Sequence, residues 1–295
     1  MCGIIGCVGR DADTLDVLLD GLANLEYRGY DSAGIALADG SLSVVKRAGE
    51  LSNLQAAVDG TDEPLTGSVG IGHTRWSTHG PPTDDNAHPH VDCTGSVAVI
   101  HNGIIENYQS IRDDLEAAGH DFLSETDTEV IPHLIEEAMA DGADFLEAFR
   151  DAIGRLEGSY AVAAVASGED AVLAARRGSP LVLGVGDDAY YLGSDVPAFL
   201  AETNRVVYVE DGEIARLDPD GWSVTDGDGE PVAHEVRTVD WDPEETGKGG
   251  YDHYMLKEIH EQPRSLRQCI QGRVDELAGS IEVEELSDVG PVDAV

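Results

Sequence analysis

The strongest constraint on the fold is a series of short, closely spaced apolar segments that begins just after Gly158. Turn residues such as Gly, Asp and Pro separate these segments, which makes each of them typical of a strand. Strands so short and so tightly spaced favour antiparallel pairing, because parallel neighbours need long crossover connections. We therefore predict antiparallel strands at Tyr160–Ala166, Ala171–Ala175, Leu181–Val185, Val206–Val209 and Ile214–Leu217.

The first half of the chain combines strands with a group of helices. Leucines at three- and four-residue spacing predict an amphipathic helix over Thr14–Leu25, and Asp39-Gly40 predicts a hairpin turn. Further strands are predicted at residues 3–8, 33–38, 42–46, 69–74 and 97–102, and further helices at 107–118, 128–140 and 145–156. Because the helices are grouped rather than placed between successive strands, we predict an α+β domain with two stacked sheets and outer helices.

The pattern changes again near residue 240. A polar loop over residues 225–250 leads out of the first domain, a helix is predicted over residues 251–270, and the chain ends in an acidic tail without clear structure. We predict a first domain over residues 2–240. Residues 241–295 are expected to form a linker and a short helical extension that is too short to be a domain by itself.

The charge of the chain excludes several classes of partner. Asp and Glu total 58 against 18 Lys and Arg, which gives a net charge of −40. Such a surface repels nucleic acid and anionic membranes, so neither is expected as a partner. It is typical of a hydrated acidic surface adapted to high salt, and we predict a halophilic source. No membrane-spanning run and no signal pattern are evident in the sequence, which favours a cytoplasmic protein.

The cysteines give one candidate nucleophile. None of the four forms a CxxC pair or a Cys/His set with zinc spacing, so no metal site is predicted, and Cys7, Cys93 and Cys269 are expected in the core. Cys2 differs because removal of Met1 would place a thiol and a free α-amine on one residue. That amine has a reference pKa of about 7.7–8.0 and can accept the thiol proton.

Three other segments carry groups that such a nucleophile needs. In "VIHNGIIEN", a strand is expected to end at His101, so that Asn102 and Gly103 form a turn with donors for an oxyanion. In "GHTRWSTHG", Arg75 can bind a carboxylate with help from Thr78 and His79. In "SETDTEVI", a helix-capping signature is predicted over residues 126–129, with one acid capping and the other holding an ammonium group in a pocket.

Together these motifs resemble the glutaminase domain of the isomerising glutamine–fructose-6-phosphate aminotransferases. The resemblance rests on "MCGIIG", "LEYRGYDSAGIA", "HTRWSTHG", "NAHPH", "HNGIIENY", "SETDTEVI", "RRGSPLVLG" and "KGGYDHYMLKEIHEQP", which occur in this order along almost the whole chain. Several of these pieces are shared with other class II amidotransferases. An amidophosphoribosyltransferase-like glutaminase and a catalytically silent glutamine-binding module therefore remain as alternatives.

The resemblance implies a four-layer αββα sandwich of the N-terminal nucleophile hydrolase type and the hydrolysis of glutamine without a cofactor. It implies that Cys2 is the nucleophile with its own α-amine as base. It further implies roles for the remaining site residues: Asn102 and Gly103 in the oxyanion site; Arg75, Thr78, His79 and Asp127 in binding glutamine; and Arg28, Gly29 and Trp76 in support.

The resemblance also implies what this chain does not carry. Members of the family are about twice as long and have a second half that binds and aminates the sugar phosphate, whereas this chain ends at "DVGPVDAV". We expect this chain alone to form glutamate and ammonia but no glucosamine 6-phosphate. A sugar-isomerase half would come from another chain unless the gene product is truncated, and oligomer formation is compatible with the sequence.

Overall fold

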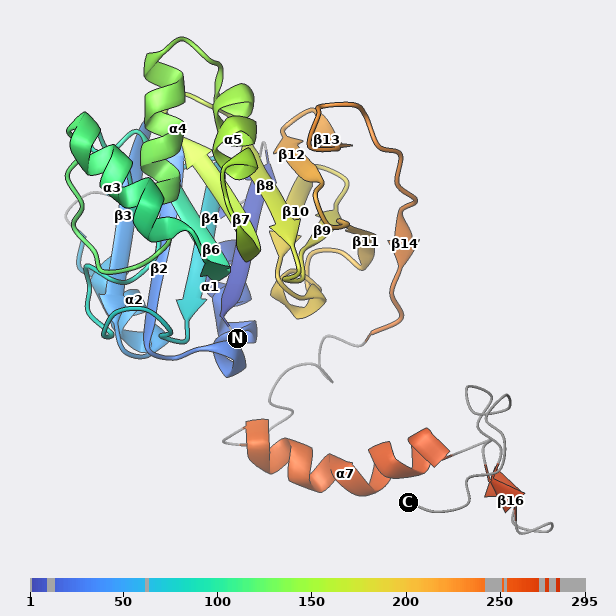
Figure 1. Cartoon of the computed structure of the whole chain (residues 1–295). Coiled ribbons are helices and arrows are strands. Elements are labelled where there is room, and N and C mark those ends of the chain that lie inside the picture. Colours follow the sequence, from blue (N-terminus) through green and yellow to red (C-terminus); the bar gives the residue numbers. More distant parts are fainter. Residues whose placement is uncertain are drawn as a thin grey trace, which may run out of the picture. The chain divides into compact units, whose positions relative to one another are not determined.

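The computed structural model describes residues 2–9, 14–61, 64–241, 251, 254–270, 274–275 and 280–281 (Figure 1). The chain divides into two compact units, Met1–Pro243 and Glu244–Val295. The first unit contains two large antiparallel sheets, and the second contains a helix and a small two-stranded sheet. In the part of the chain that the structure describes, no helix is long and apolar enough to cross a membrane.

The two large sheets of the first unit pair only antiparallel strands, as the spacing of the apolar segments predicted. The first sheet has the order β14-β11-β9-β10-β1-β4-β2-β3 and the second the order β13-β12-β8-β7-β6-β5. The strands of the first sheet are β1 (Gly3–Gly9), β2 (Ser32–Asp39), β3 (Ser41–Ala48), β4 (Val69–Arg75), β9 (Val182–Val185), β10 (Ala189–Gly193), β11 (Arg205–Tyr208) and β14 (Arg237–Thr238). Those of the second are β5 (His90–Val91), β6 (Val97–Ile105), β7 (Gly158–Ala166), β8 (Val172–Arg177), β12 (Ile214–Asp218) and β13 (Gly221–Thr225).

Helices cover the outer face of each sheet. The helices α1 (Thr14–Asn24) and α2 (Leu51–Asp59), with the short 3-10 turns η1 (Glu26–Arg28) and η2 (Val196–Ala198), pack on the first sheet. The helices α3 (Tyr108–Ala118), α4 (Val130–Ala140) and α5 (Phe145–Gly154) lie together on the second (Figure 1). The result is the four-layer αββα sandwich that the resemblance implied.

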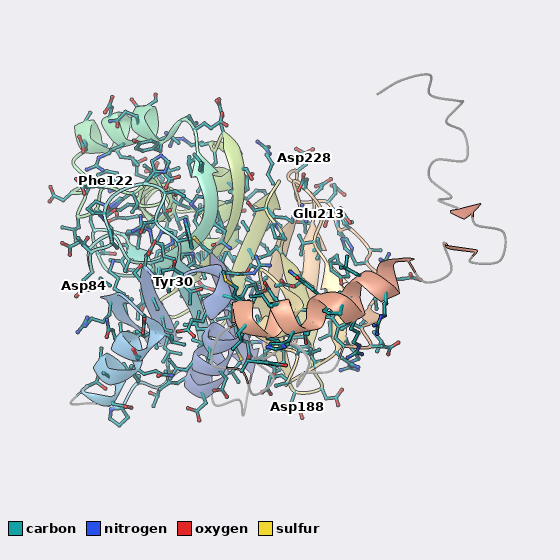
Figure 2. The ribbon with its side chains drawn as sticks, turned by 90° about the horizontal axis from the view of Figure 1, so that it is seen from below. Tyr30, Asp84, Phe122, Asp188, Glu213 and Asp228 are labelled. Carbon is teal, nitrogen blue, oxygen red and sulfur yellow. The ribbon has the colours of Figure 1, made fainter. Side chains whose placement is uncertain are left out.

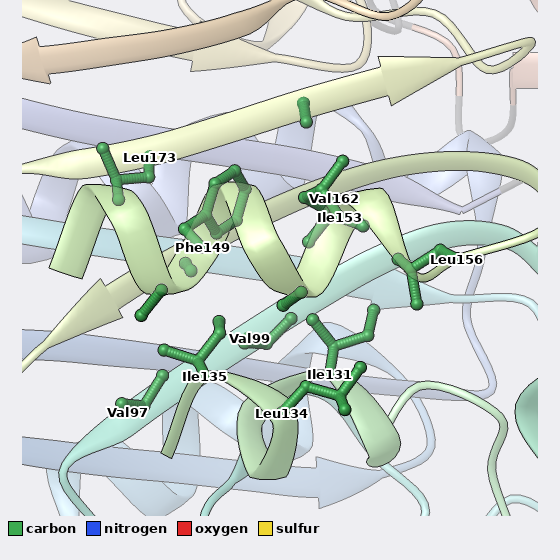
Figure 3. Close-up of a cluster of buried hydrophobic side chains, with 14 of the residues drawn as sticks. Val97, Val99, Ile131, Leu134, Ile135, Phe149, Ile153, Leu156, Val162 and Leu173 are labelled. Carbon is green, nitrogen blue, oxygen red and sulfur yellow. The ribbon is translucent and has the colours of Figure 1, made fainter. Parts of the chain in front are cut away.

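Three hydrophobic clusters hold these layers together. One lies between the two sheets, and each of the other two fills the space between a sheet and its helices. In the cluster on the second sheet, Phe149 and Ile153 of α5 face Ile131 and Ile135 of α4 and the apolar side of β6 and β7 (Figure 3). Burial of large side chains at about 1.5–3 kcal/mol each is what ties the helices to the sheet.

Several local predictions were wrong. The helix α2 and the strands β5, β10, β13 and β14 were not predicted, and β6 continues to Ile105 instead of ending at His101. The predicted capping box does not form, because Glu129 is the N-cap of α4 without a side-chain bond to the helix. Its carboxylate instead accepts the backbone N–H groups of Leu123 and Ser124.

The cysteine predictions had different outcomes. Cys7 is buried as predicted, but Cys93 is exposed in the turn between β5 and β6. The side chain of Cys269 lies outside the described residues. In the second unit, α7 (Tyr254–Ile270) confirms the predicted helix, and β15 (Val274–Asp275) pairs with β16 (Ser280–Ile281). Most of the acidic tail lies outside the described residues.

Candidate active site

The candidate site is the polar end of the layer between the two sheets. Side chains alternate between the faces of a strand, so residues two apart point the same way. The apolar residues on the inner faces of the central strands are Ile4, Val8, Val69, Ile71, Ala98 and Ile100. Continuing each alternation towards one end of the sheets brings Cys2, His73, Arg75 and Asn102 into the same layer. Since β1 begins where the antiparallel β4 ends, these polar residues meet at one end of the strands.

A cavity of about 300 Å³ opens at this end of the two sheets. It brings together eight of the residues that the sequence assigned to the site: Cys2, Arg28, Arg75, Trp76, Thr78, Asn102, Gly103 and Asp127. Gly29 and His79 do not line it, although both contact Arg75. Its volume suits a ligand the size of an amino acid.

The thiol of Cys2 lies against the backbone of Trp76. The Trp76 N–H donates to Cys2 Sγ over 3.1 Å. Burial raises the pKa of the Cys2 thiol above its usual value, and the Trp76 hydrogen bond only partly opposes this. The sulfur therefore stays protonated near neutral pH, so that any nucleophilic role requires a nearby base.

Asn102 is held from both ends of its amide. Asn102 Nδ2 donates to the Cys2 carbonyl oxygen over 2.9 Å, and Asn102 Oδ1 lies 2.9 Å from His73 Nε2. Burial lowers the pKa of His73 to about 3, so its ring is neutral. Because Oδ1 can only accept, His73 must carry its proton on Nε2. The second N–H of Asn102 Nδ2 remains for a ligand beside the thiol.

Gly103 occupies a position that excludes other residues. Its φ of +127° lies in the region that side chains rarely adopt, and an added Cβ would stand 2.0 Å from the Ser159 carbonyl oxygen. Glycine is what lets β6 continue to Ile105 while its backbone borders the cavity. The predicted turn is thus a distorted continuation of the strand, opposite Tyr160 of β7.

Arg75 and Asp127 place opposite charges in the cavity. Arg75 donates through Nη2 to the His79 carbonyl oxygen, while its buried Nη1 has no partner among the described residues. Burial lowers the pKa of Arg75, but a guanidinium stays charged at any physiological pH. Asp127 Oδ2 accepts the Ile105 N–H over 2.8 Å, which fixes the carboxylate at the cavity wall. A buried cation with a free donor is suited to a ligand carboxylate.

The rim of the cavity is formed by the segment around Arg28. Its Nη2 lies 2.5 Å from Asp195 Oδ2, which joins η1 to the start of η2. Gly29 packs so closely on the end of β4 that an added Cβ would stand 2.6 Å from the Arg75 carbonyl carbon. Trp76 is 46% exposed and meets the ring of Tyr30 edge-on at 5.5 Å (Tyr30 is labelled in Figure 2).

A buried group of histidines behind the cavity had no predicted role. His88 stacks on His73 with ring centroids 4.3 Å apart, and its Nδ1 accepts the His101 backbone N–H. His101 Nδ1 in turn lies 2.9 Å from Thr128 Oγ1. The motif "NAHPH" contains His88, and His73 stands two residues before Arg75 on the same strand face, so both signals were present in the sequence. His88, His101 and Thr128 also line the cavity. The rest of the lining is formed by Ile104, Thr126, Ser179 and Pro180.

Among solved structures, glutamine amidotransferases superpose on this chain. The glutamine phosphoribosylpyrophosphate amidotransferase from B. subtilis superposes with a TM-score of 0.66 and 28% identity over 77% of this chain and 49% of that one. A glutamine aminotransferase class-II domain protein from Silicibacter pomeroyi gives a TM-score of 0.51 at 15% identity, which supports the fold alone. The chain has the fold of the N-terminal nucleophile amidotransferases.

Comparison of sequences shows which amidotransferases this chain resembles. The glutamine amidotransferase domain family matches residues 73–201. The isomerising glutamine–fructose-6-phosphate aminotransferase of Halobacterium salinarum is 54% identical over 97% of this chain and 47% of its own length. That of a Thermus thermophilus strain is 52% identical over 100% of this chain and 48% of its own length. The chain is thus similar to a glutamine amidotransferase domain over residues 73–201 and to these aminotransferases along nearly its whole length, and it spans about half of theirs.

Proposed function

We propose that this chain hydrolyses the side-chain amide of glutamine, with Cys2 as the nucleophile. The observation that carries the proposal is the convergence of four groups on one cavity: the Cys2 thiol, the Asn102 amide, the Asp127 carboxylate and the Arg75 guanidinium, whose Nη1 has no partner among the described residues. A thiol with an adjacent amide donor is suited to attack on a carboxamide. The two charged groups match the two charged ends of an α-amino acid.

Glutamine binds in this proposal through its α-carboxylate and α-ammonium groups. The free Nη1 of Arg75 donates to the carboxylate, assisted by the exposed Thr78 at the cavity rim. Asp127 pairs with the ammonium through the oxygen that does not accept from Ile105. The δ-carboxamide then reaches Cys2 and Asn102. The distance between the charged groups and the thiol would therefore select substrates by the length of their side chain.

The reaction begins once Met1 has been removed and the α-amine of Cys2 is free. That amine takes the thiol proton as Sγ attacks the carboxamide carbon, and the oxyanion is stabilised by the second N–H of Asn102 and by the backbone N–H of Gly103. The amine then passes the proton to the leaving nitrogen, and ammonia departs. Water, deprotonated by the same amine, hydrolyses the thioester to glutamate and restores the thiol.

We further propose that the ammonia serves the amination of fructose 6-phosphate to glucosamine 6-phosphate. The support is the sequence identity of 54% and 52% to two relatives that are named for this reaction. The sugar reaction would be carried by a sugar-isomerase half, so this chain alone is expected to release ammonia. A catalytic thiol that must stay reduced also fits a cytoplasmic location.

Intact mass and ammonia release test the glutaminase proposal. Loss of Met1 and a single adduct from a glutamine-analogue electrophile at Cys2 are expected, together with glutamine-dependent ammonia release. Cys2→Ala should abolish adduct and release, whereas the matched control Cys269→Ser should keep both. Glutamine binding without ammonia release in the wild type would favour the silent binding module. Ammonia release that survives in Cys2→Ala would refute the nucleophile.

A further inference from the structure

A second group of reactive side chains lies outside the glutamine cavity. It consists of Cys93, His120, His133 and Glu136, whose ligand atoms all lie within 4.8 Å of one another. Cys93 stands in the turn between β5 and β6, and His120 follows the end of α3. His133 and Glu136 are three positions apart and therefore share one face of α4. We refer to these four residues as the Cys93 cluster.

We propose that the Cys93 cluster binds one Zn²⁺ ion in a closed, tetrahedral site. In tetrahedral zinc sites with Zn–S of about 2.3 Å and Zn–N or Zn–O of about 2.0–2.1 Å, ligand atoms are about 3.6 Å apart for S···N and about 3.4 Å for N···O. Cys93 Sγ lies 3.6 Å from Nδ1 of His120 and 3.6 Å from Nδ1 of His133. Glu136 Oε2 lies 3.1 and 3.3 Å from the same two nitrogens.

Hydrogen bonding accounts for only part of this arrangement. Both Nδ1 atoms lie near the same sulfur and the same carboxylate oxygen, and each nitrogen carries at most one proton for these four contacts. A cation at the centre accepts lone pairs from all four groups at once. One thiolate, two imidazoles and one carboxylate form a donor set of mixed softness that suits zinc better than magnesium or calcium.

Polar groups of neighbouring residues lie close to the ligand residues of the cluster. The Asp121 backbone N–H donates to Cys93 Sγ over 3.4 Å, which stabilises a thiolate. Metal-bound histidines usually direct the second ring nitrogen at a carboxylate. Here carboxylate oxygens lie near these nitrogens but beyond hydrogen-bond distance. His120 Nε2 is 3.7 Å from Glu137 Oε1, and the buried His133 Nε2, which has no hydrogen-bond partner among the described residues, is 4.0 Å from Glu129 Oε1.

The ion would tie the helical layer to the edge of the second sheet. It would join the turn after β5, the end of α3 and the first turns of α4, three segments distant in sequence. Phe122, labelled in Figure 2, packs on the His133 ring with centroids 4.6 Å apart and shields this side. Glu129, the carboxylate beside His133, also accepts from the Leu123 and Ser124 backbone. The ion thereby stabilises the connection between α3 and α4.

Metal content and cobalt spectroscopy on the full chain test this proposal. Molar KCl in all buffers suppresses loose cation binding by the acidic surface. One Zn²⁺ per chain is expected after dialysis, and Co²⁺ substitution should give tetrahedral visible bands with a thiolate-to-cobalt charge-transfer band. Cys93→Ser and His120→Ala should each weaken Zn²⁺ binding more than about tenfold, and Cys93→Ser should abolish the charge-transfer band.

The matched control is His234→Ala. His234 lies 2.9 Å from Glu213 in a His–carboxylate pair without a thiol, so its loss should leave the metal content unchanged. Far-UV circular dichroism confirms that the variants fold, and the exposed position of Cys93 favours this. If the folded, Co²⁺-treated wild type shows no thiolate-to-cobalt charge-transfer band, the proposal is overturned. Equal Zn²⁺ content in the wild type and Cys93→Ser would also overturn it. Neither result depends on glutaminase activity.

Discussion

The buried histidines behind the glutamine cavity predict a steep loss of stability in mild acid. Burial lowers the pKa of His73 to about 3 and also lowers the pKa values of His88, His90 and His101. In the unfolded chain a histidine titrates near pH 6.5. Below that pH the unfolded chain binds protons that the folded chain does not. The free energy of unfolding therefore falls as the pH falls.

The size of the effect follows from proton linkage. Between about pH 6.5 and 5.5, one histidine that stays neutral in the fold, as His73 does, costs about 1 kcal/mol of stability, and each further ring that stays neutral adds to this cost. Even one or two such contributions are a large share of the roughly 5–15 kcal/mol by which proteins are stable. Most Asp and Glu side chains remain ionised in this interval, so their titration contributes little to the slope.

Urea unfolding at fixed molar KCl and at closely spaced pH values between 6.5 and 5.5 measures this slope. We expect the wild type to take up at least two protons on unfolding near pH 5.5. His73→Gln retains a donor for Asn102 and should lower the uptake by about one proton. A wild-type slope of less than one proton, or an unchanged slope in His73→Gln, would refute the assignment of neutral buried rings.

Four further predictions concern the site and the surface. Asn102→Ala should lower kcat by about 10²–10³ with little change in KM, because an oxyanion donor acts mainly in the transition state; steady-state ammonia release measures it, and near-normal turnover would exclude the role. Asp127→Ala should mainly raise KM for glutamine in the same assay, and an unchanged KM would exclude contact with the ammonium group. Gly103→Ala should lower the free energy of unfolding in urea by about 3 kcal/mol or more, because its Cβ would stand 2.0 Å from the Ser159 carbonyl oxygen. The control Gly95→Ala, at φ +68° with open space around it, should lower it by only about 1 kcal/mol. Raising KCl from about 0.1 M to about 1 M should raise the urea midpoint, because it screens the repulsion within a chain of net charge −40; a falling midpoint would contradict the halophilic interpretation.

The sequence predicted the architecture where its signals are local. Short strands, leucine spacing and grouped helices are read from neighbouring residues, and these gave the two antiparallel sheets and the outer helices. The helix α2 was missed because Leu51–Asp59 is a short, weakly apolar segment. The capping prediction failed because Glu129 bonds to Leu123 and Ser124, a contact that depends on the path of the preceding loop.

The candidate site residues could be chosen from motifs, but the contacts that surround them could not. Cys2, Asn102 and Asp127 stand in short distinctive segments, and the fold brings them to one cavity. The role of His73 depends on a bond to Asn102 on the opposite sheet. The Cys93 cluster likewise has no recognisable spacing, because Cys93 and His120 lie 27 positions apart and meet only through the packing of helices on the sheet.

The hydrogen bond from Asn102 to the Cys2 carbonyl has a consequence for the order of events during synthesis. The thiol belongs to one sheet and its amide partner to the other, so neither sheet alone contains a working centre. In the proposed mechanism, glutamine cleavage can therefore start only after the two sheets have packed on each other. A chain whose sheets have not yet packed is then not expected to release ammonia.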